Sequence, residues 1–436
     1  MIKFGLFLSL LLFSLNLSAQ YFPVISDQYS HPEDSIGILS SMLSSADSLY
    51  MKDTTQEQSQ GTVPSLKDDW YDKIRIRGYA QLRYNRLLET NPNLKCAQCD
   101  NSWGEGGGFF FRRIRLVFFG HVSERLYIYI QPDLASTQTR VRGGFHYAQV
   151  RDAYFDLALN DDKSFRLRFG QSKVPFGFEN LQSSQNRIPL DRHDGINSAV
   201  ANERDLGVFM YWAPKKIRQR FAKLITSGLK GSGDYGVFGA GIYNGQTANS
   251  PSNDGKVYGV TRITYPFKTA GGQYIEMSLQ AYRGEFDITK SSEDVGGADF
   301  FTEQRAAASF IYYPQPFGFQ MEYNIGEGPE FNPHTMSIEN NTLRGGYAMA
   351  YYRYVKNGQV YIPFVRHHSY RGGKKHEVDA TRHRVDEWEI GVEWQPFINF
   401  ELVASYTISN RRFENFQMPH NRQFGNLLRL QAQFNF

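Results

Sequence analysis

The last eleven residues, NLLRLQAQFNF (426–436), alternate apolar and polar side chains. Leu428 and Leu430 fall on one face of an extended chain, whereas Arg429 and Gln431 fall on the other. A period of two residues is that of a β-strand with one apolar and one polar side. The stretch therefore predicts a strand with an apolar environment on one side and a polar environment on the other.

The same alternation recurs along most of the chain, beginning with IRIRGYAQLR (74–83) and interrupted by Gly, Pro, Asn and Asp clusters. Most of the alternating segments have 8–13 residues. That range brackets the ~9–11 residues that a tilted strand needs to cross a bilayer. The sixteen predicted strands are 74–86, 109–122, 125–132, 148–159, 164–171, 205–213, 235–244, 256–266, 273–283, 304–313, 317–326, 343–355, 359–369, 385–395, 399–408 and 425–436.

The connections between these strands alternate in length. Links after even-numbered strands are tight, such as Ser123-Glu124, whereas links after odd-numbered strands are long and polar, such as 87–108 and 172–204. Short turns on one side and long loops on the other are typical of an outer-membrane barrel. One link, 214–234, is long where a short turn is expected, and we interpret it as a helical insertion rich in Lys and Arg.

Strand pattern and connections together predict an all-β fold, a transmembrane antiparallel β-barrel of about sixteen strands with long extracellular loops and short periplasmic turns. An open sheet edge in hydrocarbon would leave N–H and C=O groups unpaired at several kcal/mol each, so the sheet must close. Roughly 16–18 strands leave an aqueous channel, whereas smaller barrels fill their interior with side chains. We therefore expect a pore in the bacterial outer membrane.

The first 70 residues differ from the rest. Residues 1–19 have a basic start, an apolar core and a small-residue end, which predicts a secretory signal peptide. Residues 20–70 are acidic and polar, and we interpret them as a periplasmic leader with room for one short amphipathic helix. The barrel is then assigned to 71–436, where Lys and Arg exceed Asp and Glu.

Composition excludes several other classes. Beyond the N-terminus no stretch approaches the ~18–20 apolar residues of a spanning helix, and an aromatic content of 15% argues against disorder. Two cysteines cannot form a disulfide framework. Cys96 and Cys99 form a C-x-x-C pair in a long loop, which we interpret as a local disulfide, with metal binding as the less favoured alternative.

Arginines dominate the predicted polar faces and are expected to line the lumen. A row of guanidinium groups raises the local concentration of anions, and each group can hold a phosphate or carboxylate bidentately. The alternative is that these arginines pair with neighbouring acids and serve solubility and rigidity. The arginines assigned to the anion pathway are Arg75, Arg77, Arg113, Arg115, Arg166, Arg168, Arg262 and Arg429.

The 33-residue connection 172–204 is the third long loop. A loop of this length either folds outward or dips into the channel, where its charges would set selectivity. We assign it as an inward-folded constriction loop. Its assigned charged residues are Lys173, Glu179, Arg187, Asp191, Arg192 and Arg204.

The order of elements over residues 72–436 resembles the phosphate-selective porin O and P family. The resemblance is carried by RRIRLVFFGHV (112–122), RDAYFDL (151–157), RFGQSKVPFG (168–177) and the closing strand. It implies a sixteen-stranded, generally trimeric barrel with an arginine-rich lumen, an inward-folded third loop and diffusion of small anions such as phosphate. Acids such as Asp191 in the loop weigh against strict phosphate preference.

The remaining motifs predict no further chemistry. We interpret His367, His368, His376 and His383 as part of a solvated loop and not as a metal site, and we find no paired Ser and His of a barrel hydrolase. We expect that the protein is not an enzyme and that it binds no cofactor, metal ion or nucleic acid.

The expected partners are small anionic solutes, outer-membrane lipid, the barrel assembly machinery and further copies of the chain in a homotrimer. The Phe-terminated last strand resembles the signal that the assembly machinery recognises. Two other functions stay open: a barrel whose loops bind a surface partner or glycan, and a general porin without anion selectivity.

Overall fold

The computed structural model describes residues 70–88, 108–136, 147–252 and 255–436. The predicted signal peptide, most of the predicted leader and the Cys96/Cys99 pair lie outside the described residues. Among the described residues, no helix is long and apolar enough to cross a bilayer.

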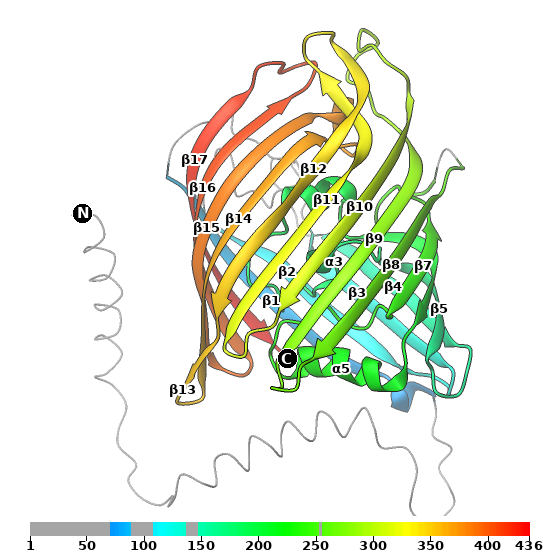
Figure 1. The fold of residues 1–436 in the computed structure, drawn as a ribbon, viewed down its shortest axis with the longest axis vertical. Coiled ribbons are helices and arrows are strands. Elements are labelled where there is room, and N and C mark those ends of the chain that lie inside the picture. Colours follow the sequence, from blue (N-terminus) through cyan, green and yellow to red (C-terminus); the bar gives the residue numbers. More distant parts are fainter. Residues whose placement is uncertain (1–69, 89–107, 137–146, 253–254) are drawn as a thin grey trace, which may run out of the picture. The chain divides into compact units, whose positions relative to one another are not determined.

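The described chain forms one closed antiparallel sheet (Figure 1). Each strand pairs with its neighbours in sequence, and β1 also pairs with β17. Since β12 and β13 both pair with β14, they are two parts of one strand, and the barrel has sixteen. The predicted architecture is thus confirmed. The strands are β1 (Arg75–Leu87), β2 (Gly108–His121), β3 (Leu126–Ser136), β4 (Tyr147–Ala158), β5 (Phe165–Lys173), β6 (Arg204–Trp212), β7 (Phe238–Tyr243), β8 (Tyr258–Lys268), β9 (Tyr274–Asp287), β10 (Phe300–Tyr312), β11 (Phe317–Asn332), β12 (Ser337–Tyr352), β13 (Tyr354–Lys356), β14 (Gln359–Gly373), β15 (Arg382–Phe397), β16 (Phe400–Glu414) and β17 (Arg422–Asn435).

The seam of the barrel joins the first and last strands. Tyr79 to Leu87 pair with Asn435 to Leu427 in antiparallel register. At the end of the seam the Gly78 N–H donates to the Phe436 carbonyl at 2.8 Å, and the Phe436 N–H donates to the Gly78 carbonyl at 3.0 Å. The terminal residue therefore closes the sheet through its backbone.

Side chains alternate between lipid and lumen as the sequence predicts. On β8, Ile263 is 58% exposed on the outer face, while Tyr258 and Arg262 on the inner face are almost fully buried. On β17, Arg429 and Gln431 point inward and Leu430 is 42% exposed. An apolar outer surface of this kind is what hydrocarbon requires.

Several strands are longer than predicted on the loop side. β11 runs to Asn332, six residues beyond its predicted end, because the backbone of Gly328 and Pro329 still pairs with Asn341 and Asn340 of β12. The Gly and Pro in this stretch predicted a loop, but pairing between neighbouring strands outweighs these local signals.

Short helices complete the fold: η1 (Trp70–Lys73), α3 (Phe178–Leu181), α4 (Asp194–Ala199), α5 (Lys215–Thr226) and η2 (Val378–Ala380). α5 lies in the 214–234 link, at the end of the barrel that holds the short turns (Figure 1). Ile217, Phe221 and Leu224 recur at helical spacing and pack with Phe178 and Tyr313 in one buried cluster. The insertion is thus an amphipathic helix whose apolar face turns inward.

The seam predicts a specific weakness at Gly78. A Cβ at this position would lie 2.5 Å from the Phe436 ring and 2.6 Å from the Arg115 carbonyl oxygen. We expect Gly78→Val to lower the free energy of unfolding by roughly 1–3 kcal/mol because the added methyls overpack the seam. The measurement is the thermal unfolding of purified protein in detergent, read from the heat-dependent gel mobility of the folded barrel.

Gly259 on β8 supplies the matched control, since a Cβ there meets nothing within 4 Å. Gly259→Val should leave stability unchanged or raise it slightly, because Val suits a strand better than Gly. Equal unfolding temperatures for the two variants would contradict the role assigned to the seam.

Candidate functional site: the lumen constriction

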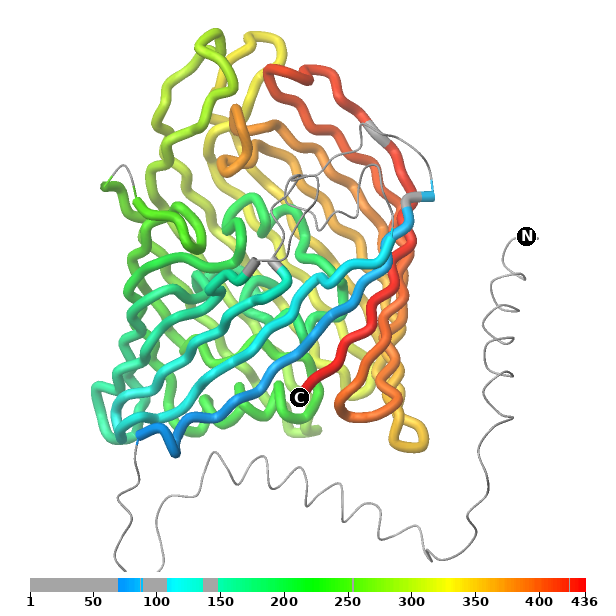
Figure 2. Tube along the Cα trace, turned by 180° about the vertical axis from the view of Figure 1, so that it is seen from behind, coloured from blue at the N-terminus to red at the C-terminus, as the bar shows by residue number. Residues whose placement is uncertain are grey.

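The connection between β5 and β6 lies inside the ring of strands (Figure 2). Phe176 and Ile196 have no exposed surface, and the Phe176 ring packs edge-on against Tyr282 of β9, with 4.7 Å between ring centres. Gly177 takes a positive φ of 83°, and a Cβ there would lie 2.3 Å from Ile196. The sequence VPFG thus buries an apolar wedge in the lumen, and only glycine fits at its tip.

Lys173 holds the first turn of this loop. Its Nζ donates to the carbonyl oxygens of Asn180, Leu181 and Gln182 at 2.8, 3.2 and 2.5 Å. An ammonium group has three donors, so the loop backbone uses all of them. Lys173, which the sequence assigns to the constriction, is buried and has no donor left for a solute.

Glu179 fastens the loop to the opposite wall. Its carboxylate lies 2.9 Å from the Arg366 guanidinium of β14 and 2.7 Å from Nδ1 of His193, and it accepts the His193 backbone N–H at 2.7 Å. Burial alone would raise the pKa of Glu179, but Arg366 and the bond with His193 outweigh it and lower the pKa to about 2. Burial lowers the pKa of His193 to about 4, so the imidazole is neutral at pH 7.

A second ion-pair cluster surrounds Glu203 at the end of the loop. Its carboxylate is 3.2 Å from Arg187 and 3.6 Å from Arg192, and it also pairs with Arg204. Arg204 reaches Asp152 of β4 at 2.9 Å. Burial opposes ionisation of Glu203, yet these cations hold its pKa well below the usual range. The assigned arginines are therefore brought together here. Arg187 and Arg192 pair with Glu203 within the loop, and Arg204 of β6 joins this cluster to Asp152 of β4.

Asp191 forms the most open part of the site. It lies 3.3 Å from Arg83 of β1, 2.5 Å from Arg429 of β17 and 4.0 Å from Arg112 of β2. The side chains of Asp191 and Arg112 keep 26% and 29% of their surface exposed. Burial works against the carboxylate, but Arg83, Arg429, Arg112 and then Arg113 hold the pKa of Asp191 far below its ordinary value. Four cations thus act on one anion.

Most of the other assigned lumen arginines point inward and are paired with acids. Their carboxylate partners come from neighbouring strands, from the 214–234 insertion or, for Arg429, from both the wall and the loop. The pairs are Arg115 with Asp133 (2.7 Å), Arg166 with Asp234 (2.8 Å), Arg168 with Asp156 (2.7 Å), Arg262 with Glu276 (3.4 Å) and Arg429 with Glu389 (2.9 Å).

Three assigned arginines differ from this pattern. Arg113 donates to the Gln81 side chain at 2.8 Å and makes no ion pair within the described residues. Arg75 and Arg77 lie near the start of β1 and are exposed, and the Arg77 guanidinium is 5.1 Å from the centre of the Phe119 ring. Inward cations without a carboxylate partner are thus found on β1 and β2.

The 214–234 insertion occupies the turn side of the lumen. After α5 the chain crosses toward the opposite wall, where Lys230 lies 2.6 Å from Glu393 of β15. Its carbonyl accepts a 2.6 Å bond from Gln182 of the inward loop. The loop and the insertion therefore contact each other inside the barrel, which the sequence did not predict.

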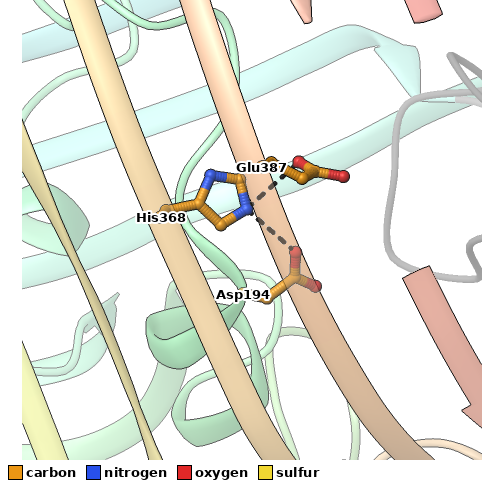
Figure 3. Close-up of side chains that lie close together, drawn as sticks. All are labelled: Asp194, His368 and Glu387. Carbon is orange, nitrogen blue, oxygen red and sulfur yellow. Dashed lines mark hydrogen bonds and ion pairs between the residues drawn. The ribbon is translucent and has the colours of Figure 1, made fainter. Parts of the chain in front are cut away.

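Asp194, His368 and Glu387 bring one imidazole and two carboxylates within 4.8 Å of one another (Figure 3). This is a donor set that a metal ion could use. Both carboxylates, however, already hold Arg411, at 2.9 Å from Asp194 and 2.6 Å from Glu387, and Lys374 is 2.5 Å from Asp194. Two fixed cations would repel a divalent ion. The cluster is better explained as a set of ion pairs that holds α4 against the barrel wall.

The predicted solvated histidine loop is wrong in part. His368 and His383 are buried, and so are Lys374 and Asp379 in the connection after β14. Asp379 accepts bonds from the Ser291 backbone and hydroxyl, both at 2.7 Å. The connection packs against the next loop because its charged groups find partners there, which residue spacing along one chain cannot show.

Three of the cations in this site that the sequence did not assign were missed for definable reasons. Arg112 sits where the register of β1 with β2 shifts by one residue, so strict alternation assigns it to the lipid face. Arg366 lies on an inner face that also carries Ile362 and Phe364, so neither side of β14 looks polar. Arg411 falls beyond the predicted end of its strand.

Comparison with known proteins agrees with this architecture. The sequence matches the phosphate-selective porin O and P family over residues 96–300 and 282–436. No curated protein matches it.

Among solved structures, the outer membrane channel DcaP of Acinetobacter baumannii is 14% identical, with 83% of this chain and 97% of that chain covered and a TM-score of 0.50. OmpF of Salmonella typhi, in complex with daunomycin, is 12% identical, with 83% and 97% covered and a TM-score of 0.53. At these sequence identities, the similarity shows a shared fold.

The family match covers β2 to β17 and the inward loop, and the closed sixteen-stranded barrel is the fold of an outer-membrane channel. This chain therefore belongs to the phosphate-selective porin O and P family and is a porin of the bacterial outer membrane.

Proposed function

We propose that the barrel lets small anions, including phosphate, diffuse passively past Arg112 and Arg113. The observation that carries the proposal is the cluster at Asp191, where four guanidinium groups act on one loop carboxylate. Among the described residues, the other acid paired with this cluster is Glu389, which lies 2.9 Å from Arg429. Excess positive charge between low-dielectric walls raises the local concentration of anions. The partial exposure of Arg112 leaves it accessible from the water-filled part of the lumen.

The mechanism is electrostatic and reversible. An anion entering from the loop side exchanges part of its hydration for guanidinium hydrogen bonds at Arg112, and Arg77 lies further along the same wall toward the turns. Conduction requires that each site bind the anion strongly enough for it to enter and weakly enough for it to leave. Asp191 competes with the solute for the same arginines, and this competition keeps each site weak.

The paired state of the other arginines favours moderate anion preference over strict phosphate specificity. Arg115, Arg168 and Arg262 each have a carboxylate partner within 3.4 Å. A solute would have to displace a buried partner to reach them, which is costly. We therefore assign selectivity to the excess charge at Arg112 and Arg113.

The proposed assembly follows the family. We propose a homotrimer inserted by the barrel assembly machinery, which would read the alternating C-terminal strand that ends in Phe436. Chemical cross-linking of the purified protein in mild detergent tests the trimer.

Removing the excess charge should reduce anion preference. For Arg112→Gln/Arg113→Gln in planar bilayers under a KCl gradient, we expect the anion-to-cation permeability ratio to fall roughly twofold to fivefold. The control is Lys268→Gln/Lys356→Gln, which removes the same charge from exposed positions at the turn side. An unchanged ratio in the lumen variant would remove these arginines from the mechanism. Repeating the recording in phosphate shows whether current saturates.

Removing the competing acid should act in the opposite direction. Asp191→Asn keeps the side-chain shape but releases Arg83, Arg112 and Arg429 from their shared carboxylate, so we expect the anion-to-cation ratio to rise about twofold. Asp161→Asn, at an exposed turn where the side chain is 91% accessible, is the control. A ratio that stays constant or falls in Asp191→Asn would show that Asp191 does not restrain the arginines.

A further inference from the structure

Five arginines stand side by side on the outside of the barrel. Strand pairing places Arg344 opposite Arg371, Arg371 opposite Arg384, Arg384 opposite Arg412, and Arg412 opposite Arg422. The row crosses β12, β14, β15, β16 and β17 without interruption. The residues on either side along the strands, such as Leu343, Tyr370, Val385 and Phe413, are buried in the lumen, so the arginines face outward.

This arrangement is unfavourable for the barrel alone. Directly opposed side chains on antiparallel strands have Cβ atoms about 4.5–5.5 Å apart, and like charges there destabilise the sheet. Arg412 lies 2.7 Å from Glu414, and Arg422 stacks on Phe424. Arg344, Arg371 and Arg384 make no hydrogen bond or ion pair within the described residues. No carboxylate of the described residues therefore lies within ion-pair distance of these three central arginines.

The acids beside the row have other partners. Glu330, which acts electrostatically on Arg384, lies 3.1 Å from Arg382. Glu414 lies 2.7 Å from Arg412, and Glu327 accepts a 3.5 Å bond from Gln304. Asp386 is the next outward residue after Arg384 on β15, and it lies 3.3 Å from His367 of β14. The outward side chains beyond it become apolar, with Ile390 56% and Val365 38% exposed. The row therefore borders the apolar surface on its loop side, which in this class of barrel faces the cell exterior.

An apolar hollow adjoins the row at β11. It measures about 1050 Å³ and lies on the outer face of β5 to β12, where small residues such as Ala281 and Ala306 leave room beside Val208 and Ile325. Its lining is mainly apolar and also includes the charged Arg283 and Glu327. Ile325 is directly opposite Arg344. A mainly apolar hollow with Arg344 beside it suits a lipid, with a chain in the hollow and an anionic headgroup at the arginine.

We propose that Arg344, Arg371 and Arg384 bind the phosphate groups of an anionic lipid of the outer leaflet, with one of its acyl chains in the hollow beside Ile325. Guanidinium groups bind phosphate bidentately, and the phosphates relieve the repulsion between opposed arginines. Because barrel strands are tilted, a row of paired residues runs obliquely to the membrane plane. Successive arginines therefore reach different depths, which suits a lipid that carries more than one phosphate.

The test uses full-length purified protein and Arg371→Gln/Arg384→Gln. The probe is a bis-phosphorylated glucosamine disaccharide lipid added to neutral detergent micelles, with its dephosphorylated form and inorganic phosphate as separate arms. Native mass spectrometry counts bound lipid. We expect about tenfold weaker binding of the phosphorylated lipid to the variant, weak binding of the dephosphorylated lipid to both proteins, and little competition from inorganic phosphate. The Lys268→Gln/Lys356→Gln control should bind like the parent.

Thermal unfolding gives a second readout that a simple folding defect would not produce. Without lipid, the variant should unfold at a higher temperature than the parent, because two opposed charges are gone; with the phosphorylated lipid, this order should reverse. Equal lipid binding by variant and parent would overturn the proposal. So would equal binding of the dephosphorylated lipid, full displacement by inorganic phosphate, or loss of self-association in the variant, which would make a second copy the occupant.

Discussion

The structure depends on one constraint: backbone N–H and C=O groups have no partner in the hydrocarbon of a bilayer other than another strand. β1 and β17 satisfy it where they pair from Tyr79–Asn435 to Leu87–Leu427. Once the sheet is closed, side-chain alternation leaves each strand with one face on lipid and one on the lumen. Charged residues can then lie only in the lumen, at the loop side or at the turns. The ion pairs and the proposed binding sites are therefore found in these three places.

Inside the barrel, positive and negative groups are forced into a small, poorly solvated volume. Breaking a buried pair there costs several kcal/mol, because the remaining charge stays uncompensated. Glu179 with Arg366 and Glu203 with Arg187 therefore hold the inward loop in one position. The same pairing removes most lumen arginines from contact with solutes. We therefore infer that anion preference rests on a local surplus of positive charge, at Arg112 and Arg113, and not on the total number of arginines.

The sequence predicted the features that repeat and missed those that depend on contacts between distant segments. All sixteen strands follow from a period of two residues, which hydrocarbon on one side and water on the other impose. The extension of β11 past Gly328 and Pro329 could not be predicted, because it depends on pairing with β12. Many inward arginines were found by parity, but a register shift displaces Arg112, and Arg366 shares its face with apolar residues. Arg411 lies beyond the predicted end of its strand. The pairing of Lys230 with Glu393 across the lumen has no local signal at all.

Arginine has opposite consequences on the two faces of the same sheet. In the lumen, Arg168 meets Asp156 from the neighbouring strand, so the chain supplies its own counter-charge. On the outer face, Arg371 meets Arg344 on one side and Arg384 on the other, so pairing the strands concentrates charge of one sign. Folding energy alone would disfavour such a row, since Gln or Thr would satisfy the same positions without repulsion. We infer that the counter-charge for Arg344, Arg371 and Arg384 comes from the membrane, so that the barrel surface is matched to the anionic groups of its lipids as well as to their hydrocarbon.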